Sequence, residues 1–239
     1  MSEAARRDSG VRAAAAPAGF WRRYAAWSLD IAVVGALATL LAWSSLVSGW
    51  QAITAASARL SDLLGTQLAD ALMHGTRADA LAPQLLADPA VQAAASAVES
   101  GIDRMLLPWL PWMLALAALW FVGFEAGPWQ ATPGKRALRM RVVGAVDDAR
   151  PPLARIALRH GSGALSWLTL NLGHLLVAVS PRGRALHDLV AGTRVVSDAA
   201  QPRLPAWARA WLGLQVLACF VLLAWGLARY MAMLRASLG

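Results

Sequence analysis

Three long apolar runs dominate the chain, and each is long enough to cross a lipid bilayer as a helix. They cover residues 25–48, 107–125 and 207–228. At a rise of 1.5 Å per residue, about 20 apolar residues span the roughly 30 Å hydrocarbon core. Tryptophans lie near the ends of these runs, where amphipathic rings favour the membrane interface. The pattern predicts an all-α polytopic membrane protein built as a small bundle of transmembrane helices.

A fourth apolar run, residues 161–180, is interrupted in its middle by Asn171, Gly173 and His174. Both flanks are basic, so a full crossing would put the arginines of the following segment on the outer side. We favour a re-entrant hairpin that returns to the cytoplasm, and a fourth span is the alternative. Irregular backbone at membrane depth requires protein or water around it.

Residues 51–105 form a long polar insert after the first span. Apolar residues recur at helical spacing on either side of a break at 75–83, which predicts two amphipathic helices. The insert holds three arginines against six acidic residues. We therefore expect an extracytoplasmic helical hairpin. Pro108 and Pro111, which follow it, suit the first turn of the second span.

The composition supports a membrane protein: 58% of the residues are hydrophobic and only 15% are charged. The net charge of +8 arises from basic residues that flank the apolar runs, rather than from one face of a soluble module, so nucleic acid is not expected as a partner. Arg22 and Arg23 stand just before the first span, which places the N-terminus in the cytoplasm. Residues 1–19 lack an apolar signal-peptide core and are expected to form a disordered cytoplasmic tail.

Arg23 and Asp30 open the first span with an unusual pair of charges. Seven residues separate them, so they share one face of a helix, about 10 Å apart along its axis. A carboxylate at membrane depth normally faces a partner rather than lipid. Asp30 is therefore the first candidate for a functional or structural polar site, and Glu125 is a second acidic group at the inner end of the next span.

Two segments echo each other later in the chain, KRALRMRVV at 135–143 and RALHDLVAGTRVV at 184–196. Each ends in an Arg-Val-Val run that is typical of a strand. The two runs are expected to pair as a short cytoplasmic β-pair, and Gly192 indicates a turn into the second strand.

The opening Arg-x6-Asp, the element QATPGKR at 130–136 and the late HDLVAGTRVV together resemble the RDD family of bacterial membrane proteins, named for an arginine and two aspartates. The resemblance covers about residues 20–48 and 106–197, and the match to the turn at Gln130 is weaker because members commonly have glycine near there. It implies Arg23, with Arg22 as the less favoured match, Asp30 and Asp188 as the motif cluster. The supporting motif residues are Thr132, Gly134, Lys135, Arg136, His187, Gly192 and Thr193.

This resemblance defines an RDD-like domain at 20–197, which contains the insert 51–105, and a linker with the C-terminal transmembrane helix at 198–239. It implies the bacterial inner membrane, with a role as an accessory or scaffold subunit of a membrane complex or as a small transporter. A transporter of this size would need to form an oligomer. We thus expect the lipid bilayer and either a protein partner or further copies of the chain as partners.

Two interpretations of the motif cluster remain open. If Asp188 reaches Arg23 and Asp30, one arginine lies between two carboxylates. Such a triad either pins the fold as a satisfied ion-pair network or leaves one acid with a movable proton. His187 and His174 would extend a proton relay in the second case.

Other chemistry is not favoured by the sequence. GKR at 134–136 lacks the spacing and the following hydroxyl of a phosphate-binding loop, and no GxSxG elbow occurs. The four histidines show no metal-ligand spacing, so no metal, cofactor or enzymatic activity is expected. Basic side chains of the loop after the second span are expected to contact lipid headgroups: Lys135, Arg136, Arg139 and Arg141.

Overall fold

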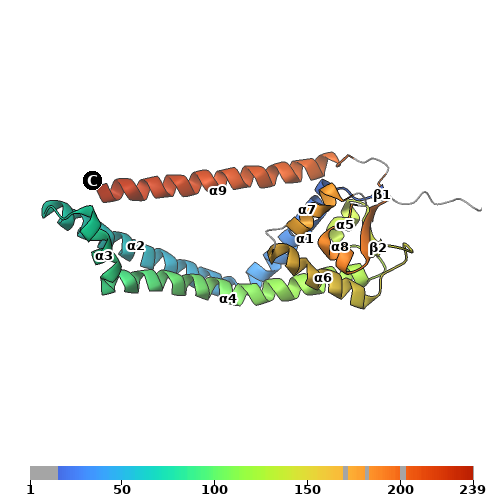
Figure 1. Cartoon of the computed structure of the whole chain (residues 1–239), viewed down its shortest axis with the longest axis horizontal. Coiled ribbons are helices and arrows are strands. Elements are labelled where there is room, and N and C mark those ends of the chain that lie inside the picture. The colour runs from blue at the N-terminus through green and yellow to red at the C-terminus, as the bar shows by residue number, and fades with distance from the viewer. Residues whose placement is uncertain (1–15, 169–171, 181–182, 200–202, 239) are drawn as a thin grey trace, which may run out of the picture. The chain divides into compact units, whose positions relative to one another are not determined.

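A computed structural model of the protein describes residues 16–168, 172–180, 183–199 and 203–238 (Figure 1). The chain divides into two compact units, each described separately below. Unit 1 comprises Met1–Val34 and Ala115–Leu212, and unit 2 comprises Gly35–Leu114 and Gly213–Gly239. The elements in chain order are β1 (Ala16–Pro17), α1 (Phe20–Leu41), α2 (Trp43–Met73), α3 (Ala78–Ala87), α4 (Pro89–Ala126), α5 (Pro133–Ala137), β2 (Met140–Gly144), α6 (Leu153–Leu168), α7 (Leu172–Val179), α8 (Leu186–Val190), β3 (Thr193–Ser197) and α9 (Ala206–Leu238).

Three helices of the described chain are long and apolar enough to cross a membrane. They are α1 (Phe20–Leu41), α4 (Pro89–Ala126) and the part of α9 from Ala206 to Ala232. The predicted all-α polytopic class with three spans is thereby confirmed. The fourth apolar run, 161–180, contains the second half of α6, which begins earlier at Leu153, and the 8-residue helix α7. Residues 169–171 between these helices lie outside the described part.

Two boundary predictions were wrong. Pro108 and Pro111 lie inside α4, because the helix of the insert continues without a break into the second span. A proline removes one intrahelical hydrogen bond, and transmembrane helices tolerate this where neighbouring groups satisfy the freed carbonyl. The break expected at 75–83 is shorter: α2 ends at Met73, Gly75 has a positive φ of 66°, and α3 begins at Ala78.

Unit 1 contains the three-stranded sheet with the order β1-β3-β2, in which both pairs are antiparallel. The expected pairing of the two Arg-Val-Val runs is confirmed, with Val142 opposite Val195 and Arg141 opposite Val196. Gly192 enters β3 with a φ of 61°, a conformation that side chains with a Cβ rarely adopt.

Residues 16–18, which were predicted to belong to a disordered tail, are part of the fold. Ala16 and Pro17 form β1 and pair with Ser197 and Val196, and the N–H of Ala18 donates to the carbonyl of Val195 at 3.0 Å. These backbone hydrogen bonds and the complete burial of Ala18 hold the segment against the sheet. Residues 1–15 lie outside the described part.

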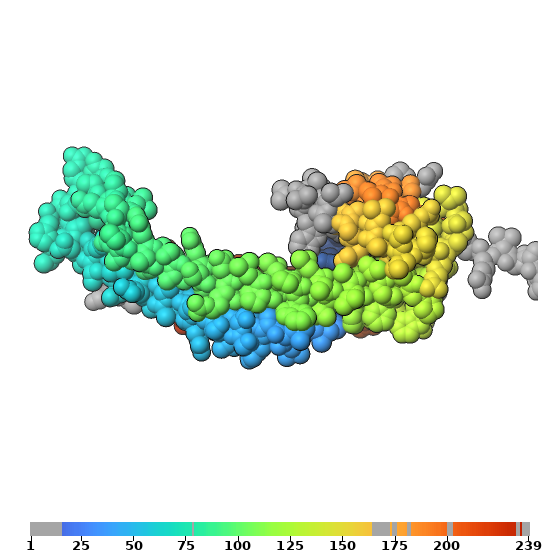
Figure 2. Space-filling view, turned by 90° about the horizontal axis from the view of Figure 1, so that it is seen from below, coloured from blue at the N-terminus to red at the C-terminus, as the bar shows by residue number. Residues whose placement is uncertain are grey.

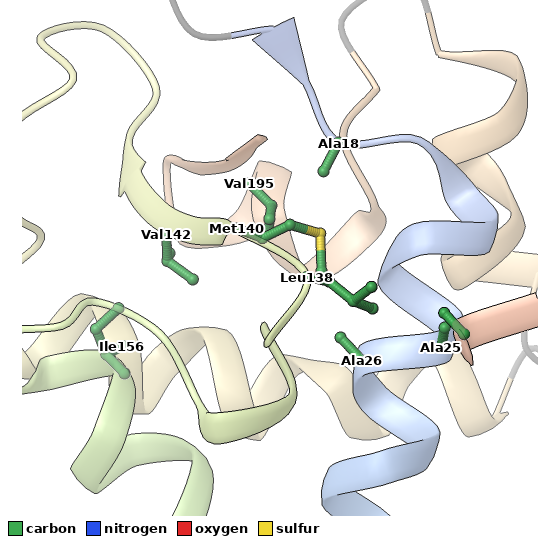
Figure 3. Packing of buried hydrophobic residues seen from close by; sticks show 9 residues of the cluster. Ala18, Ala25, Ala26, Leu138, Met140, Val142, Ile156 and Val195 are labelled. Carbon is green, nitrogen blue, oxygen red and sulfur yellow. The ribbon is translucent and has the colours of Figure 1, made fainter. Parts of the chain in front are cut away.

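The hydrophobic core of unit 1 joins α1 to the sheet (Figure 3). Small residues on α1 let the neighbouring segments approach closely, and larger aliphatic side chains from the sheet and α6 fill the space between them. Its members are Ala18, Ala25, Ala26, Leu138, Met140, Val142, Ile156, Val195 and Ala208.

In unit 2, α2 lies beside the first part of α4 along the insert (Figures 1 and 2). A Cβ built on Gly49 would lie 2.8 Å from the Cβ of Met105, and one built on Gly101 would lie 2.8 Å from Cγ1 of Ile53. The two glycines therefore permit the close packing of these antiparallel helices. The indole of Trp109 also donates to the hydroxyl of Thr39 at 3.2 Å.

Replacing Leu138 by alanine should destabilise unit 1 by about 2–5 kcal/mol, because its fully buried side chain would leave a cavity in the core. Leu189→Ala, at a side chain that is 45% exposed, is the matched control and should cost less than about 1 kcal/mol. Denaturant titration of the purified full chain in detergent measures both. Equal losses for the two variants would contradict the placement of Leu138 in the core.

Candidate functional site

Asp30 lies on the buried face of α1 and is only 1% exposed. The hydroxyl of Thr132 donates to its Oδ2 at 2.5 Å. The N–H of Gly134 and the indole N–H of Trp120 donate to its Oδ1 at 2.9 and 3.1 Å. No ion pair joins Asp30 to a described cation. Three neutral donors therefore satisfy this carboxylate.

The segment that faces Asp30 is shaped by its sequence. Thr132 is the N-cap of α5 in an extended conformation, and Pro133 at the first helical position has no N–H to satisfy. The first N–H groups of the helix thus point away from it, and one of them reaches Asp30. The backbone of Gly134 approaches so closely that a Cβ there would lie 2.3 Å from the carbonyl oxygen of Ala26.

Arg23 and Asp188 form the second part of the site. Nη1 of Arg23 donates to Oδ2 of Asp188 at 2.6 Å, and the carboxylate side chain is fully buried. The remaining donors of Arg23 reach backbone carbonyls, among them those of Gly183 at 2.5 Å and Ala18 at 3.0 Å. Arg22 is instead directed to the carbonyls of Leu138 and Arg203, so Arg23 is the arginine that meets the late aspartate.

Asp188 is also held by its own helix. It is the third residue of α8 and accepts the N–H of the N-cap Ala185 at 3.1 Å, which is the half of a capping box that the acidic residue supplies. The hydroxyl of Thr193 at the beginning of β3 approaches the other oxygen at 3.4 Å. The HDLVAGT element therefore forms one turn of helix, a glycine turn and a strand around a single carboxylate.

Three further charged side chains extend the site. Nε of Arg159 on α6 donates to Asp188 at 3.1 Å, and its Nη1 donates to Glu125 on α4 at 2.9 Å. Glu125 in turn pairs with the ammonium group of Lys135 on α5. The five charges alternate in sign, and each side chain is at most 11% exposed. We call this set, Arg23, Asp188, Arg159, Glu125 and Lys135, the charge chain.

The charge chain and the Asp30 site meet at α5. The backbone N–H of Lys135 lies 3.4 Å from the hydroxyl of Thr132, which donates to Asp30. A continuous series of polar contacts thus leaves α1 at Asp30 and returns to α1 at Arg23. The interpretation of one arginine between two carboxylates changes accordingly: Arg23 meets Asp188, while Asp30 meets neutral donors.

Electrostatics keep Asp188 ionised. Burial alone raises the pKa of its carboxyl, but the guanidinium groups of Arg159 and Arg23 outweigh burial and hold the pKa well below its usual range. Nε2 of His187 lies 3.1 Å from Nη2 of Arg159. The side chain of His174, which was expected to extend a relay, lies outside the described part.

The expected headgroup contacts separate into two groups. Lys135 is buried against Glu125 and cannot contact lipid in this structure, and Arg141 pairs with Asp198 at 3.1 Å. Arg136 and Arg139 are exposed, and the guanidinium of Arg136 lies 4.3 Å from the ring centroid of Trp129. Lys135, next to the motif glycine Gly134, is thus a buried partner of Glu125 rather than a surface residue. The sequence pattern alone does not distinguish these two roles.

Arg159 and Trp120 were not expected in the site. Arg159 was one of several arginines in a basic segment, and Trp120 was one of twelve tryptophans. Nothing in the sequence pattern distinguishes these two residues, because their roles depend on how α4 and α6 pack around α5. Among the described residues no group of three or more His, Cys, Asp or Glu side chains is arranged to hold a metal ion.

Three apolar helices, a small sheet and a buried polar motif around α5 and α8 define a multi-pass membrane protein. The chain matches the RDD family over residues 17–192 and belongs to it. The matched range includes every residue of the charge chain and Asp30. Comparison with curated proteins and with solved structures gave no match.

Asp188→Asn should lower the free energy of unfolding by about 3–5 kcal/mol at neutral pH, because it leaves two buried guanidinium groups without their shared anion. Asp198→Asn, which removes an exposed ion pair, should cost less than about 1 kcal/mol. Denaturant titration measures both variants. Similar losses in the two would contradict the importance of burial.

The pH dependence of stability tests the same carboxylate. Because its folded pKa is lowered, Asp188 contributes its full stabilisation above the ordinary carboxyl range, above about pH 5. Below that range the unfolded chain takes up a proton first, and the contribution is lost as the pH falls towards the folded pKa. The wild type should therefore lose stability more steeply than Asp188→Asn between about pH 5 and pH 3. Parallel curves would contradict the lowered pKa.

Gly134→Ala should destabilise the chain by about 1–3 kcal/mol, since its Cβ would clash with the backbone of α1 and with Oδ2 of Asp30 at 2.7 Å. Gly163→Ala is the matched control, because a Cβ at that helical glycine meets nothing within 4 Å. It should be neutral or slightly stabilising. Thermal unfolding of both variants decides, and a neutral Gly134→Ala would contradict the close approach of α5 to α1.

Proposed function

We propose that the chain is an accessory or scaffold subunit of a complex in the bacterial inner membrane, with its N-terminus in the cytoplasm. The observation that carries this proposal is the saturation of the charge chain. Each of its two carboxylates meets two cations, and Asp188 also accepts a backbone N–H. A group that moves protons or ions must alternate between partners, whereas these side chains hold one another in place.

The buried polar contacts support a rigid platform on one side of the membrane. They join α1, α4, α5, α6 and α8, which come from distant parts of the sequence. Such a platform keeps exposed groups around it in fixed positions, as a docking subunit requires. Arg22 and Arg23 before the first span support the cytoplasmic placement of this unit. The proposal assigns the chain no enzymatic activity.

A second candidate function, small ion- or proton-coupled transport, is favoured by Asp30 alone. Its carboxylate is buried on the membrane-spanning helix α1 and receives only neutral donors among the described residues. A buried anion without a cationic partner is suited to bind a cation or a proton. A transporter built on it would act as an oligomer, because a bundle of this size encloses little space alone.

Two measurements on the full chain separate these functions. Affinity purification from native membranes should recover a partner protein at a fixed stoichiometry, and proteoliposomes of the purified chain should show no proton-coupled cation flux. Asp30→Asn preserves the shape of the side chain: its amide oxygen can accept from Gly134 and Trp120, and its amide nitrogen can donate to the hydroxyl oxygen of Thr132. Flux in the wild type that disappears in Asp30→Asn would overturn the scaffold proposal and support transport.

The control for this pair is Asp148→Asn, at an exposed ion pair with Arg194 in unit 1. It should change neither partner recovery nor flux. Size-exclusion profiles in detergent show that each variant remains folded, so a loss of function is not confused with a loss of structure.

A further inference from the structure

The insert of unit 2 has a groove between α2 and α4 that the proposed function does not use. Its volume is about 530 Å³. Apart from two arginines, the residues that line the groove are no larger than serine, and Ala52, Ala56 and Gly101 are among them. A surface of small residues lets another helix approach closely.

Arg59 and Arg104 stand at the two ends of this groove. Both side chains are exposed, and no hydrogen bond or ion pair joins either guanidinium to another described residue. The insert as a whole is acidic, with six carboxylates against three arginines. Two uncompensated cations therefore line a groove in a surface that is otherwise negative, which favours an anionic occupant.

The same insert presents a complementary acidic edge. Glu99 and Asp103 are four residues apart on α4 and thus share one face of the helix, about 6 Å apart along its axis. Both are exposed, and neither forms an ion pair with another described residue. Asp103 and Arg104 are consecutive residues of α4, so their side chains leave the helix about 100° apart. This direction does not favour an ion pair between the two within one copy.

The positions of these charges along the helices also match. Because Ile53 packs against Gly101, Arg59 lies about 6 Å beyond the level of Glu99, within reach of an extended arginine side chain. Arg104 lies within about 2 Å of the level of Asp103. Copies of the chain in one membrane that are related by an axis along the membrane normal keep each residue at the same level.

We propose that the groove binds the acidic edge of a second copy of this chain. Arg104 meets Asp103 of the second copy and Arg59 meets Glu99 of the second copy, while the small residues admit its α4. Around the axis of α4, the acidic edge is centred about 110° away from the residues that line the groove. The contact is therefore head to tail, and repeating it links further copies, with a ring as the product when the rotation between copies closes.

Charge exchange in the full-length chain tests this contact. We expect the wild type in lipid nanodiscs or vesicles to form oligomers by single-molecule photobleaching. Arg59→Glu with Arg104→Glu should reduce the oligomeric fraction at least tenfold, and so should Glu99→Arg with Asp103→Arg. The chain with all four substitutions should regain it, because the complementarity is restored with opposite signs.

The matched control exchanges Arg77 and Asp79, which form an exposed ion pair at the tip of the insert. Arg77→Glu with Asp79→Arg should leave the oligomeric fraction unchanged. Circular dichroism verifies that each variant keeps its helices, and all six positions are exposed, so the fold does not depend on them.

Disulfide formation gives a second readout, which detects proximity directly while Glu99→Cys removes one of the two proposed ion pairs and leaves the other. In a Cys219→Ser background, Ala97→Cys in the groove and Glu99→Cys on the edge should together give a ladder of linked chains, and Ala97→Cys alone should not. A monomeric wild type, unchanged oligomers after either charge reversal, or no recovery in the fourfold variant would overturn the proposal. A monomer that retains anionic phospholipid only through Arg59 and Arg104 would assign the groove to a lipid headgroup instead.

Discussion

The buried polar path from Asp30 to Arg23 is the constraint on which unit 1 depends. It begins at Asp30 on α1, passes through α5, α4, α6 and α8, and returns to the same face of α1 at Arg23, two helical turns away. Burying these charges is costly unless each is paired, and here the signs alternate along the whole series. The hydrophobic core supplies compactness, whereas the polar path determines which segments meet. A fold held in this way has one arrangement of these five helices rather than several.

The seven-residue spacing on α1 explains why the arginine and the first aspartate of the motif have different partners. Arg23 and Asp30 share a face but lie about two turns apart, so a single partner cannot serve both. Asp188 pairs with Arg23, and the N-terminal turn of α5 donates hydrogen bonds to Asp30. Thr132 and Gly134 then provide a hydroxyl and a close backbone N–H where a larger or apolar residue would leave Asp30 unsatisfied.

Much of the fold could be predicted from the sequence, because its determinants are local. Apolar length identified the spans, and the repeated Arg-Val-Val runs identified the strand pair. The boundaries at Pro108 and Pro111 could not be predicted, since a helix can continue through proline when flanking turns and packing hold it. The site was only partly predictable: spacing identified Arg23 and Asp30, and the resemblance to the RDD family added Asp188. The bridging roles of Arg159 and Lys135 arise from tertiary packing.

Because every charge in the charge chain is paired, the motif is suited to stabilise the fold. The buried ion pair between Arg23 and Asp188 should therefore contribute directly to stability. A double-mutant cycle measures this directly. Arg23→Gln, Asp188→Asn and the double variant are compared with the wild type by free energy of unfolding in detergent. The structure predicts a coupling energy above about 1 kcal/mol, since the two side chains touch at 2.6 Å in a buried site. Losses that add within about 0.5 kcal/mol would contradict it.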